Sequence, residues 1–430
     1  MIATLVALLV TASPDPKEVP AAVLKMAVPH SGTKTDAATG GIKGYGGRHG
    51  QGGSAGTPVP GIDSLKNWTG SFTEPGFDSN GNPQSVWPYA MVGRAPQQGG
   101  RLTLHAPIIP VIVDLLDANG NVAISQSGIP LTFDPRPQVK LVLQSPIFET
   151  WPYITGRTQW TDAIFREEFL NRVHGDDQGG NEDCDHGSGW HNLLDPDVKH
   201  VQRMQIPFGF WFYGLNADGS LAFALVDENA FSAGLFPPTF PVDNTTVIGA
   251  AELAGDMTTK DVTTLLFNNV YLYEGNVNNC CVLGFHTYDF EPGIPSNGNL
   301  PRLYVFDYAS YIGNGLFTGG FEDITALSHE LSELFNDPFV DNATPWYLSP
   351  SGLCQNNLET GDAIEGLSSN VTFSIQKHGR TYHPQNIPLF QWFAFESPAS
   401  SFNGAYSFPD ETTLTTLSPP NLLPGCVPAP

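Results

Sequence analysis

Basic residues are scarce in this sequence. Only 19 Lys and Arg stand against 43 Asp and Glu, which gives a formal net charge of −24 over 430 residues. Proteins bind nucleic acids and anionic membrane surfaces largely through Lys and Arg. The composition therefore argues against both as partners.

Long apolar runs are also missing, since none reaches the roughly 18 residues that a membrane-spanning helix needs. Residues 2–10 form a short apolar run, and small residues follow it at positions 11–13. This arrangement is typical of a secretory signal, with its apolar region and cleavage zone. We therefore expect a signal-like segment at residues 1–13, no membrane span in the mature chain, and a secreted, extracellular or periplasmic protein. A buried N-terminal strand is the alternative.

Cysteines are few, and none has the Cys-x-x-Cys spacing of a zinc site. The five are Cys184, Cys280, Cys281, Cys354 and Cys426. An exported chain of this kind is expected to form one or two disulfides, and the odd number leaves at least one cysteine without a partner in the chain. Neighbouring side chains in a strand point to opposite sides. We therefore expect Cys280 and Cys281 to have different partners.

The chain carries no Gly-x-Ser-x-Gly elbow and no Walker phosphate loop. Residues 14–66 are rich in Gly and Pro and indicate a flexible leader. We expect residues 67–430 to form one domain, with a β-rich part at about 100–260 and a second part at about 261–425. Strands are predicted at 263–274, 280–288 and 302–309 because these runs are rich in β-branched and aromatic residues.

A helix is predicted directly after these strands, at residues 322–336, and it carries His329-Glu330-x-x-Glu333. This pattern differs by one residue from the zinc-peptidase pattern His-Glu-x-x-His. His329 and Glu333 stand on one face because residues four apart are neighbours on a helix, and Glu330 lies about 100° away, within reach of a metal-bound water. The apolar stripe lies almost opposite, at Ile324, Leu327, Leu331, Leu334 and Phe335. The helix should therefore bury one side and turn the other to a cleft, unless it is simply a solvated helix.

This motif resembles that of the gluzincin metallopeptidases. In that group a Glu at a comparable distance is the third metal ligand, and a following Asp orients the first His. The resemblance implies that Glu359 is a ligand and Asp362 supports it, or the reverse. Asp337 is another candidate, although Asp337-Pro338 more simply ends the helix. A plain acidic loop is the alternative reading of residues 358–365.

Residues 328–338 also resemble a helix of the plant Exordium-type (phosphate-induced) proteins, which carry Ser-His-Glu-x-x-Glu followed by Asn-Pro or Asp-Pro. A Trp at 346 and the Gly361-Asp362 pair extend this resemblance. It implies a secreted, peptidase-like pattern without establishing activity. With the gluzincin motif, it implies an α+β, zincin-like domain with a mixed sheet and an active-site helix.

One His with two carboxylates makes a hard site, which suits Zn²⁺ and tolerates Mn²⁺ or Ca²⁺. Two carboxylates also offset the charge of the metal, so a bound water should be less acidic than in a two-His site. His191 is a candidate donor to the transition state. His286, His378 and His383 are expected to be packed or surface residues.

Three functions follow. The first is a secreted metallopeptidase in which Glu330 deprotonates water for attack on a peptide or protein substrate. The second is a non-catalytic extracellular or cell-wall protein of Exordium type that keeps the fold, with or without the metal. The third, a carbohydrate-active enzyme with paired carboxylates, rests only on acidity and aromatic content.

Overall fold

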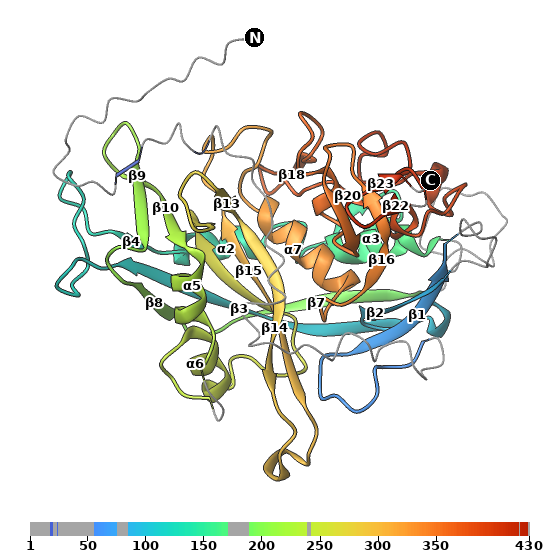
Figure 1. Cartoon of the computed structure of the whole chain (residues 1–430), viewed down its shortest axis with the longest axis horizontal. Coiled ribbons are helices and arrows are strands. Elements are labelled where there is room, and N and C mark those ends of the chain that lie inside the picture. Colours follow the sequence, from blue (N-terminus) through green and yellow to red (C-terminus); the bar gives the residue numbers. More distant parts are fainter. Residues whose placement is uncertain are drawn as a thin grey trace.

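The computed structural model describes residues 18–19, 24, 56–74, 85–170, 189–238, 242–420 and 422–428. The signal-like segment at 1–13, most of the expected leader and Cys184 lie outside these residues. The described part of the chain has an α+β architecture with a mixed central sheet (Figure 1), which confirms the expected class. Every helix described is too short or too polar to cross a lipid bilayer.

The central sheet has seven strands, and its order runs β14-β15-β11-β3-β4, with β7 and β8 also paired to β3. Strand β11 runs parallel to β15 and to β3, whereas β14 is antiparallel to β15 and forms an edge. The strands are β3 (Arg101–Leu115), β4 (Thr132–Phe133), β7 (His191–Val198), β8 (Gln202–Ile206), β11 (Thr263–Asn268), β14 (Gly284–Glu291) and β15 (Arg302–Tyr311).

A second, four-stranded sheet consists of β9 (Trp211–Leu215), β10 (Leu221–Asp227), β12 (Val270–Tyr273) and β13 (Cys280–Val282). Two-stranded ribbons complete the β structure: β1 (Asn67–Thr73) with β2 (Val86–Val92), β5 (Trp151–Tyr153) with β6 (Gly156–Thr158), β16 (Ala343–Leu348) with β17 (Cys354–Asn357), β18 (Ile375–Lys377) with β19 (Arg380–Tyr382), β20 (Ile387–Pro388) with β21 (Ser407–Phe408), and β22 (Leu422–Leu423) with β23 (Val427–Pro428).

The α-helices are α2 (Arg136–Leu143), α3 (Trp160–Glu168), α5 (Glu228–Leu235), α6 (Val247–Ala254), α7 (Thr325–Asn336) and α8 (Phe390–Phe393). Short 3-10 turns lie at η1 (Pro96–Gln98), η3 (Pro295–Asn297), η4 (Asp362–Ile364) and η5 (Phe402–Gly404). Helices α5 and α6 contact β8, while α7 contacts β14, β15 and α3.

Alternate side chains of the central strands enter different hydrophobic clusters. Leu265 and Phe267 of β11 pack in one cluster with α5 and α6, and Leu266 between them packs in the other with α7 and α3. This follows from the two-residue repeat of a strand. Because both faces are covered, β11 is apolar throughout its middle, as expected for a buried parallel strand. The sheet is therefore a rigid platform beneath α7.

Residues 56–66 fall within the expected leader, yet they pack on the folded domain. Val59 and Leu65 are buried, and the carboxylate of Asp63 lies 3.4 Å from Arg302 Nε at the start of β15. This segment was assigned to a leader because of its neighbours' Gly-rich composition. Its own apolar residues bury enough surface to order it.

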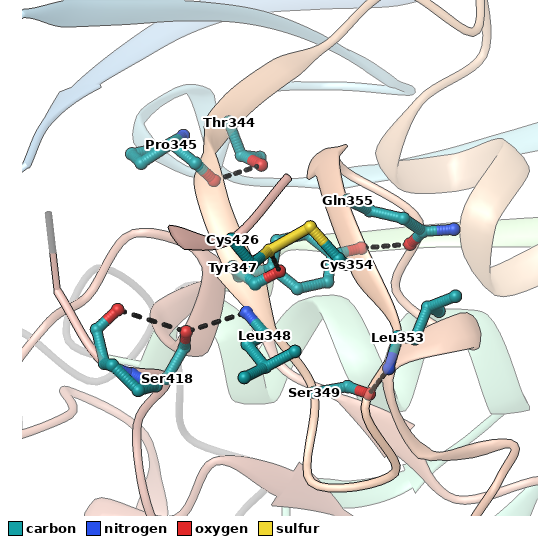
Figure 2. Close-up of a disulfide and its surroundings, with 11 residues drawn as sticks. Thr344, Pro345, Tyr347, Leu348, Ser349, Leu353, Cys354, Gln355, Ser418 and Cys426 are labelled. Atoms are coloured by element: carbon teal, nitrogen blue, oxygen red, sulfur yellow. Dashed lines mark hydrogen bonds between the residues drawn. A yellow bond between two sulfur atoms is a disulfide. The ribbon is translucent and has the colours of Figure 1, made fainter. Parts of the chain in front are cut away.

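The cysteines pair differently from the expectation. Cys354 at the start of β17 bonds to Cys426, 72 residues later, and joins the C-terminal segment to the β16–β17 ribbon (Figure 2). Cys280 and Cys281 bond to each other, so the prediction of different partners is wrong.

Candidate metal centre

Helix α7 lies in the middle of the molecule, between the central sheet and the C-terminal segment (Figure 1). It begins at Thr325 and not at 322, because Asp323 has a positive φ of 45° and bridges to Ile312. It ends at Asn336, before Asp337 and Pro338, since a proline cannot continue the hydrogen-bond ladder. The apolar stripe is buried as expected: Leu327 is 2% exposed and Leu331 is 1% exposed.

The polar face of α7 is also buried, so the expected open cleft is wrong. His329 is 2% exposed, and Glu330 and Glu333 are each 1% exposed. Strand β14 and the segment around residues 359–365 bring further side chains onto this face. A small pocket remains, lined by Leu283, Phe321, Thr325, Ala326, His329, Glu330, Glu365 and Gln385. The site is therefore a largely buried centre, with a small pocket beside His329 and Glu330.

His329 is held in one tautomer by Gln385. The amide of Gln385 donates from Nε2 to the carbonyl of Gly361, at 2.8 Å, so its oxygen faces His329 Nδ1 at 3.0 Å. In the neutral ring, His329 therefore carries its proton on Nδ1, which leaves the lone pair of Nε2 available to a metal ion. Metal-ligating histidines are oriented in this way. His329 Nε2 has no hydrogen-bond partner among the described residues.

Gly361 allows the chain to approach this ring. A Cβ at position 361 would lie 2.3 Å from Cε1 of His329, closer than any real contact. Any side chain here would displace the imidazole or the loop. The Gly in Glu359-Thr-Gly-Asp362 is thus explained by close packing on the candidate ligand.

Glu333 lies between two histidines. Its Oε1 accepts hydrogen bonds from the backbone N–H of Gly361, at 2.9 Å, and of Asp362, at 3.3 Å. Its Oε2 lies 3.1 Å from His329 Nε2 and 3.5 Å from His286 Nδ1. Burial lowers the pKa of His329 and of His286, but the carboxylates that face them raise both well above the usual range. The two charged rings in turn hold the pKa of Glu333 well below its usual range, although burial alone would raise it. A metal ion would displace the protons from the ring nitrogens that face Glu333.

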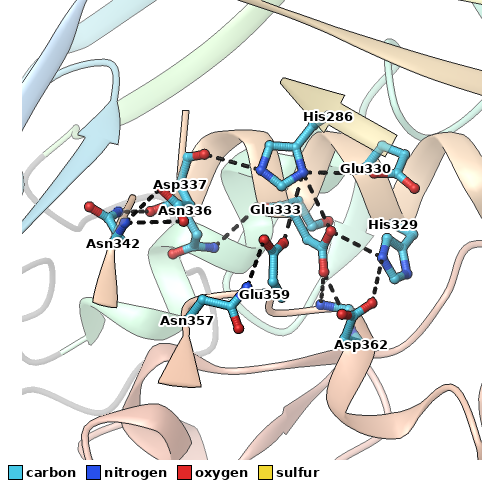
Figure 3. A network of polar contacts seen from close by, with 12 residues as sticks. His286, His329, Glu330, Glu333, Asn336, Asp337, Asn342, Asn357, Glu359 and Asp362 are labelled. Atoms are coloured by element: carbon cyan, nitrogen blue, oxygen red, sulfur yellow. Dashed lines mark hydrogen bonds and ion pairs between the residues drawn. The ribbon is translucent and has the colours of Figure 1, made fainter. Parts of the chain in front are cut away.

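His286 of β14 enters this site, although the sequence predicted a packed residue. Its Nε2 donates to the carbonyl of Asp337, at 3.1 Å, which leaves the lone pair of Nδ1 facing the carboxylates (Figure 3). Glu330 Oε2 lies 3.8 Å and Glu359 Oε2 lies 3.9 Å from that nitrogen. No spacing motif connects His286 to a helix 43 residues later. The one usable signal was its place in the strand predicted at 280–288, shortly before the motif helix.

The structure brings the downstream acids to the same place. Asp362 Oδ1 lies 3.7 Å from His329 Nε2, and its Oδ2 accepts a hydrogen bond of 2.7 Å from Gln355. Glu359 is fully buried, with Oε1 accepting from Asn357 and Oε2 without a hydrogen-bond partner among the described residues. Glu365 also arrives, with Oε1 3.5 Å from His329 Nδ1. It ends the same acidic segment, but the sequence argument had assigned it no role.

These side chains form two groups of three, within each of which the ligand atoms lie no more than 4.8 Å apart. One consists of His286, Glu330 and Glu333, and the other of His329, Asp362 and Glu365. Buried histidine and carboxylate groups at such distances could hold a metal ion. Glu330, Glu333 and Glu359 form ion-pair contacts with histidines: Glu330 and Glu359 with His286, and Glu333 with both His286 and His329.

Glu330 differs from Glu333 in its surroundings. Burial raises its pKa to about 7, although His329 and His286 act in the opposite direction. Its Oε2 has no hydrogen-bond partner among the described residues. Gly284 at the start of β14 makes room for it, since a Cβ there would lie 2.6 Å from Glu330 Oε1. A carboxyl group with this pKa exchanges protons readily near neutral pH.

Two other candidates have different partners. Asp337 accepts hydrogen bonds from the backbone N–H of Asp341 and Asn342, at 3.0 and 3.1 Å, so its carboxylate shapes the turn after α7. His191 pairs through Nδ1 with Asp162 Oδ2 of α3, at 2.7 Å, and belongs to neither group of ligands. Its suggested role as a transition-state donor stays a prediction.

Comparison of the chain with known protein families, with curated proteins and with solved structures finds no match in any of the three. The gluzincin and Exordium resemblances thus rest on the sequence motif alone. The geometry of the site itself must carry the functional argument.

Proposed function

We propose that this protein is a secreted, metal-dependent peptidase of the zincin type, with its catalytic centre on α7. The observation that carries the proposal is the convergence of His329, Glu333 and Asp362 beside Glu330, a buried carboxyl group without a hydrogen-bond partner on Oε2. Strand β14 is an edge strand of the central sheet and contacts α7, as the zincin resemblance leads one to expect of a strand beside the active-site helix.

The first metal ion fits His329 Nε2, Glu333 Oε2 and Asp362 Oδ1. Their separations from Nε2, 3.1 and 3.7 Å, are close to the roughly 3.3–3.5 Å between ligand atoms of a tetrahedral ion with bonds of about 2.0–2.2 Å. When bound, such an ion polarises a carbonyl group and lowers the pKa of a water. One imidazole with carboxylates suits Zn²⁺ and also Mn²⁺.

Glu330 is the proposed general base. Its Oε2 accepts a proton from the attacking water and later delivers it to the leaving amine. A pKa of about 7, raised by burial, suits both steps, because the group is partly ionised at neutral pH. The proposed role of Gln385 is to orient His329, since its side-chain oxygen accepts the hydrogen bond of the Nδ1–H group.

The disulfide between Cys354 and Cys426 supports secretion, since such bonds persist in oxidising compartments. The proposed substrate class is a peptide, which must reach the centre from the pocket beside Leu283 and Phe321.

A second function is favoured by one observation, the near-complete burial of every candidate ligand. Apart from Glu365, these side chains are 0–5% exposed, so they would hold a metal firmly while leaving a substrate little access. In this alternative the centre is structural, and the protein is a non-catalytic extracellular protein of Exordium type.

Turnover of casein and of mixed peptides by the full chain separates the two. The peptidase proposal predicts hydrolysis that stops with chelator and returns with Zn²⁺ or Mn²⁺. Bound metal without turnover on any peptide supports the structural alternative. Absence of bound metal contradicts both.

A further inference from the structure

The position of His286 indicates that the centre has room for more than one metal ion. We propose that the centre holds two divalent metal ions, the second bound by His286 Nδ1 and Glu359 Oε2, with Glu333 shared between the two. This inference rests on the proposed function for the placement of the first ion and for the base role of Glu330.

His286 is prepared for this task in the same way as His329. Its Nε2–H donates to the carbonyl of Asp337, so Nδ1 carries the lone pair. That lone pair faces carboxylate oxygens of Glu333, Glu330 and Glu359, at 3.5, 3.8 and 3.9 Å. A ring that is 2% exposed and surrounded by three acids has the donor set of a metal ligand.

The oxygens around His286 include two buried atoms without hydrogen-bond partners. Glu330 Oε2 and Glu359 Oε2 accept no hydrogen bond from the described residues, although their side chains are 1% and 0% exposed. An unpaired buried carboxylate oxygen is costly. Both atoms are aimed at the same nitrogen, which locates the missing partner beside His286.

Glu333 is placed to bridge two ions. Backbone N–H groups of Gly361 and Asp362 fix its Oε1, and its Oε2 lies between Nε2 of His329 and Nδ1 of His286 (Figure 3). In two-metal hydrolases the ions lie about 3.5–4 Å apart. A carboxylate between two imidazole lone pairs is the geometry that such a pair requires.

The number of acids in the centre is compatible with two ions. Five acids meet here with two histidines: Glu330, Glu333, Glu359, Asp362 and Glu365. One divalent ion offsets two negative charges, whereas two ions offset four. Burying carboxylates without such compensation is strongly unfavourable.

Metal stoichiometry tests the proposal. The full chain is stripped with chelator, dialysed against Zn²⁺ and then against buffer, and its metal content is measured. We expect two ions per chain in the wild type and one in His286→Ala and in Glu359→Gln. His378→Ala is the matched control, since His378 is exposed and pairs with Glu149, and it should retain two. One ion in the wild type overturns the proposal, even if a variant fails to fold, and so do two ions that His286→Ala retains.

Mn²⁺ supplies an independent readout. Two Mn²⁺ ions sharing Glu333 should give the broad, exchange-coupled electron paramagnetic resonance spectrum of a pair, and His286→Ala should give the six-line spectrum of one isolated ion. If fully loaded wild-type protein gives the spectrum of isolated ions, the proposal that two ions share Glu333 is overturned.

The two proposals fail separately. Peptide turnover by a protein with one ion leaves the peptidase standing and removes the second site. Two coupled ions in a protein that cleaves no peptide leave the two-ion centre standing and contradict the peptidase proposal. If Glu330→Gln loses the second ion and Glu359→Gln retains it, the assignment of Glu359 as a ligand is overturned and the base role of Glu330 falls, because Glu330 is then the ligand.

Discussion

Helices α3 and α7 pack against each other, and both bury carboxyl groups, but the partners of those groups differ. Asp162 of α3 accepts from Thr158, from Asn192 N–H and from His191. Glu168, also of α3, accepts from Phe390 N–H and from Asn336, each at 3.2 Å. The acids on and around α7 face one another and two histidine lone pairs.

The comparison shows how a buried acid is accommodated with and without a cation. Burial raises the pKa of Glu168 to about 8, so this group is mostly neutral at pH 7 and needs no positive partner. Five acids cannot all be neutralised in this way around α7, because the pKa of Glu333 is held low by His329 and His286. Burial and acidity alone therefore do not mark a metal site. What distinguishes the candidate site around α7 is the convergence of several buried carboxylates on two histidines.

The largest contrast is expected between Glu333→Gln and Glu168→Gln. Both remove a buried carboxylate and keep its shape. Glu333→Gln should reduce metal affinity by more than 100-fold and remove the rise in melting temperature that metal produces, since ligand binding to the native state stabilises it. Glu168→Gln should keep its metal. Elemental analysis and thermal melts with and without chelator measure both, and equal metal loss would end the distinction between the helices.

The next effect concerns turnover. Glu330→Gln keeps the volume of the side chain and removes its basicity, so peptide hydrolysis should fall by about 10²–10⁴-fold while bound metal stays unchanged. Initial rates on a peptide that the wild type cleaves give the comparison, with Glu168→Gln as the matched control at near-normal rate. Full activity of Glu330→Gln would contradict its role as a base.

A smaller effect is expected from the group that orients His329. Gln385→Ala removes the acceptor for Nδ1–H, and loss of such a contact typically weakens metal binding by about 10–100-fold. Gln391→Ala is the control, because Gln391 is equally buried but donates to the carbonyl of Glu168. Competition with a chromophoric chelator measures both affinities. Similar losses in the two variants would reduce the role of Gln385 to packing.

The smallest expected effect is on how the free energy of unfolding depends on pH through Glu168 of α3. The pKa of Glu168 rises from 4.5 to about 8 on folding because the group is buried, so the folded state keeps its proton longer. Its contribution to stability is present below pH 4.5 and is lost as pH rises toward 8, by at most about 1.4 kcal/mol per pH unit. Urea unfolding at pH 5, 6, 7 and 8 should show a shallower decline for Glu168→Gln than for the wild type. Parallel curves would contradict the assignment.

Part of this account could be predicted from the sequence. Helix α7, its buried stripe and the strands before it follow from local periodicity, and the motif indicated His329, Glu330 and Glu333. Glu359 and Asp362 followed from the resemblance to gluzincins. These residues lie close together in sequence or in a repeating pattern, so local geometry constrains them.

The rest depends on tertiary contacts that leave no local signature. His286 and Gln385 come from a strand before the helix and a segment 56 residues after His329, and their roles appear only when the chain closes over α7. The open cleft was predicted because a polar helix face normally meets solvent. Here β14 and the acidic segment cover that face. The polar residues of α7 therefore belong to a buried candidate metal site and not to a solvent-exposed surface.

The central claim is that the acids around α7 are held together by metal, and elemental analysis of the full chain purified without chelator tests it most directly. The account predicts Zn²⁺ or Mn²⁺ at a whole-number ratio to protein, retained on dialysis by the wild type and by Glu168→Gln and absent from Glu333→Gln. Wild-type protein that folds, carries no metal and binds none on addition of Zn²⁺ or Mn²⁺ would contradict it.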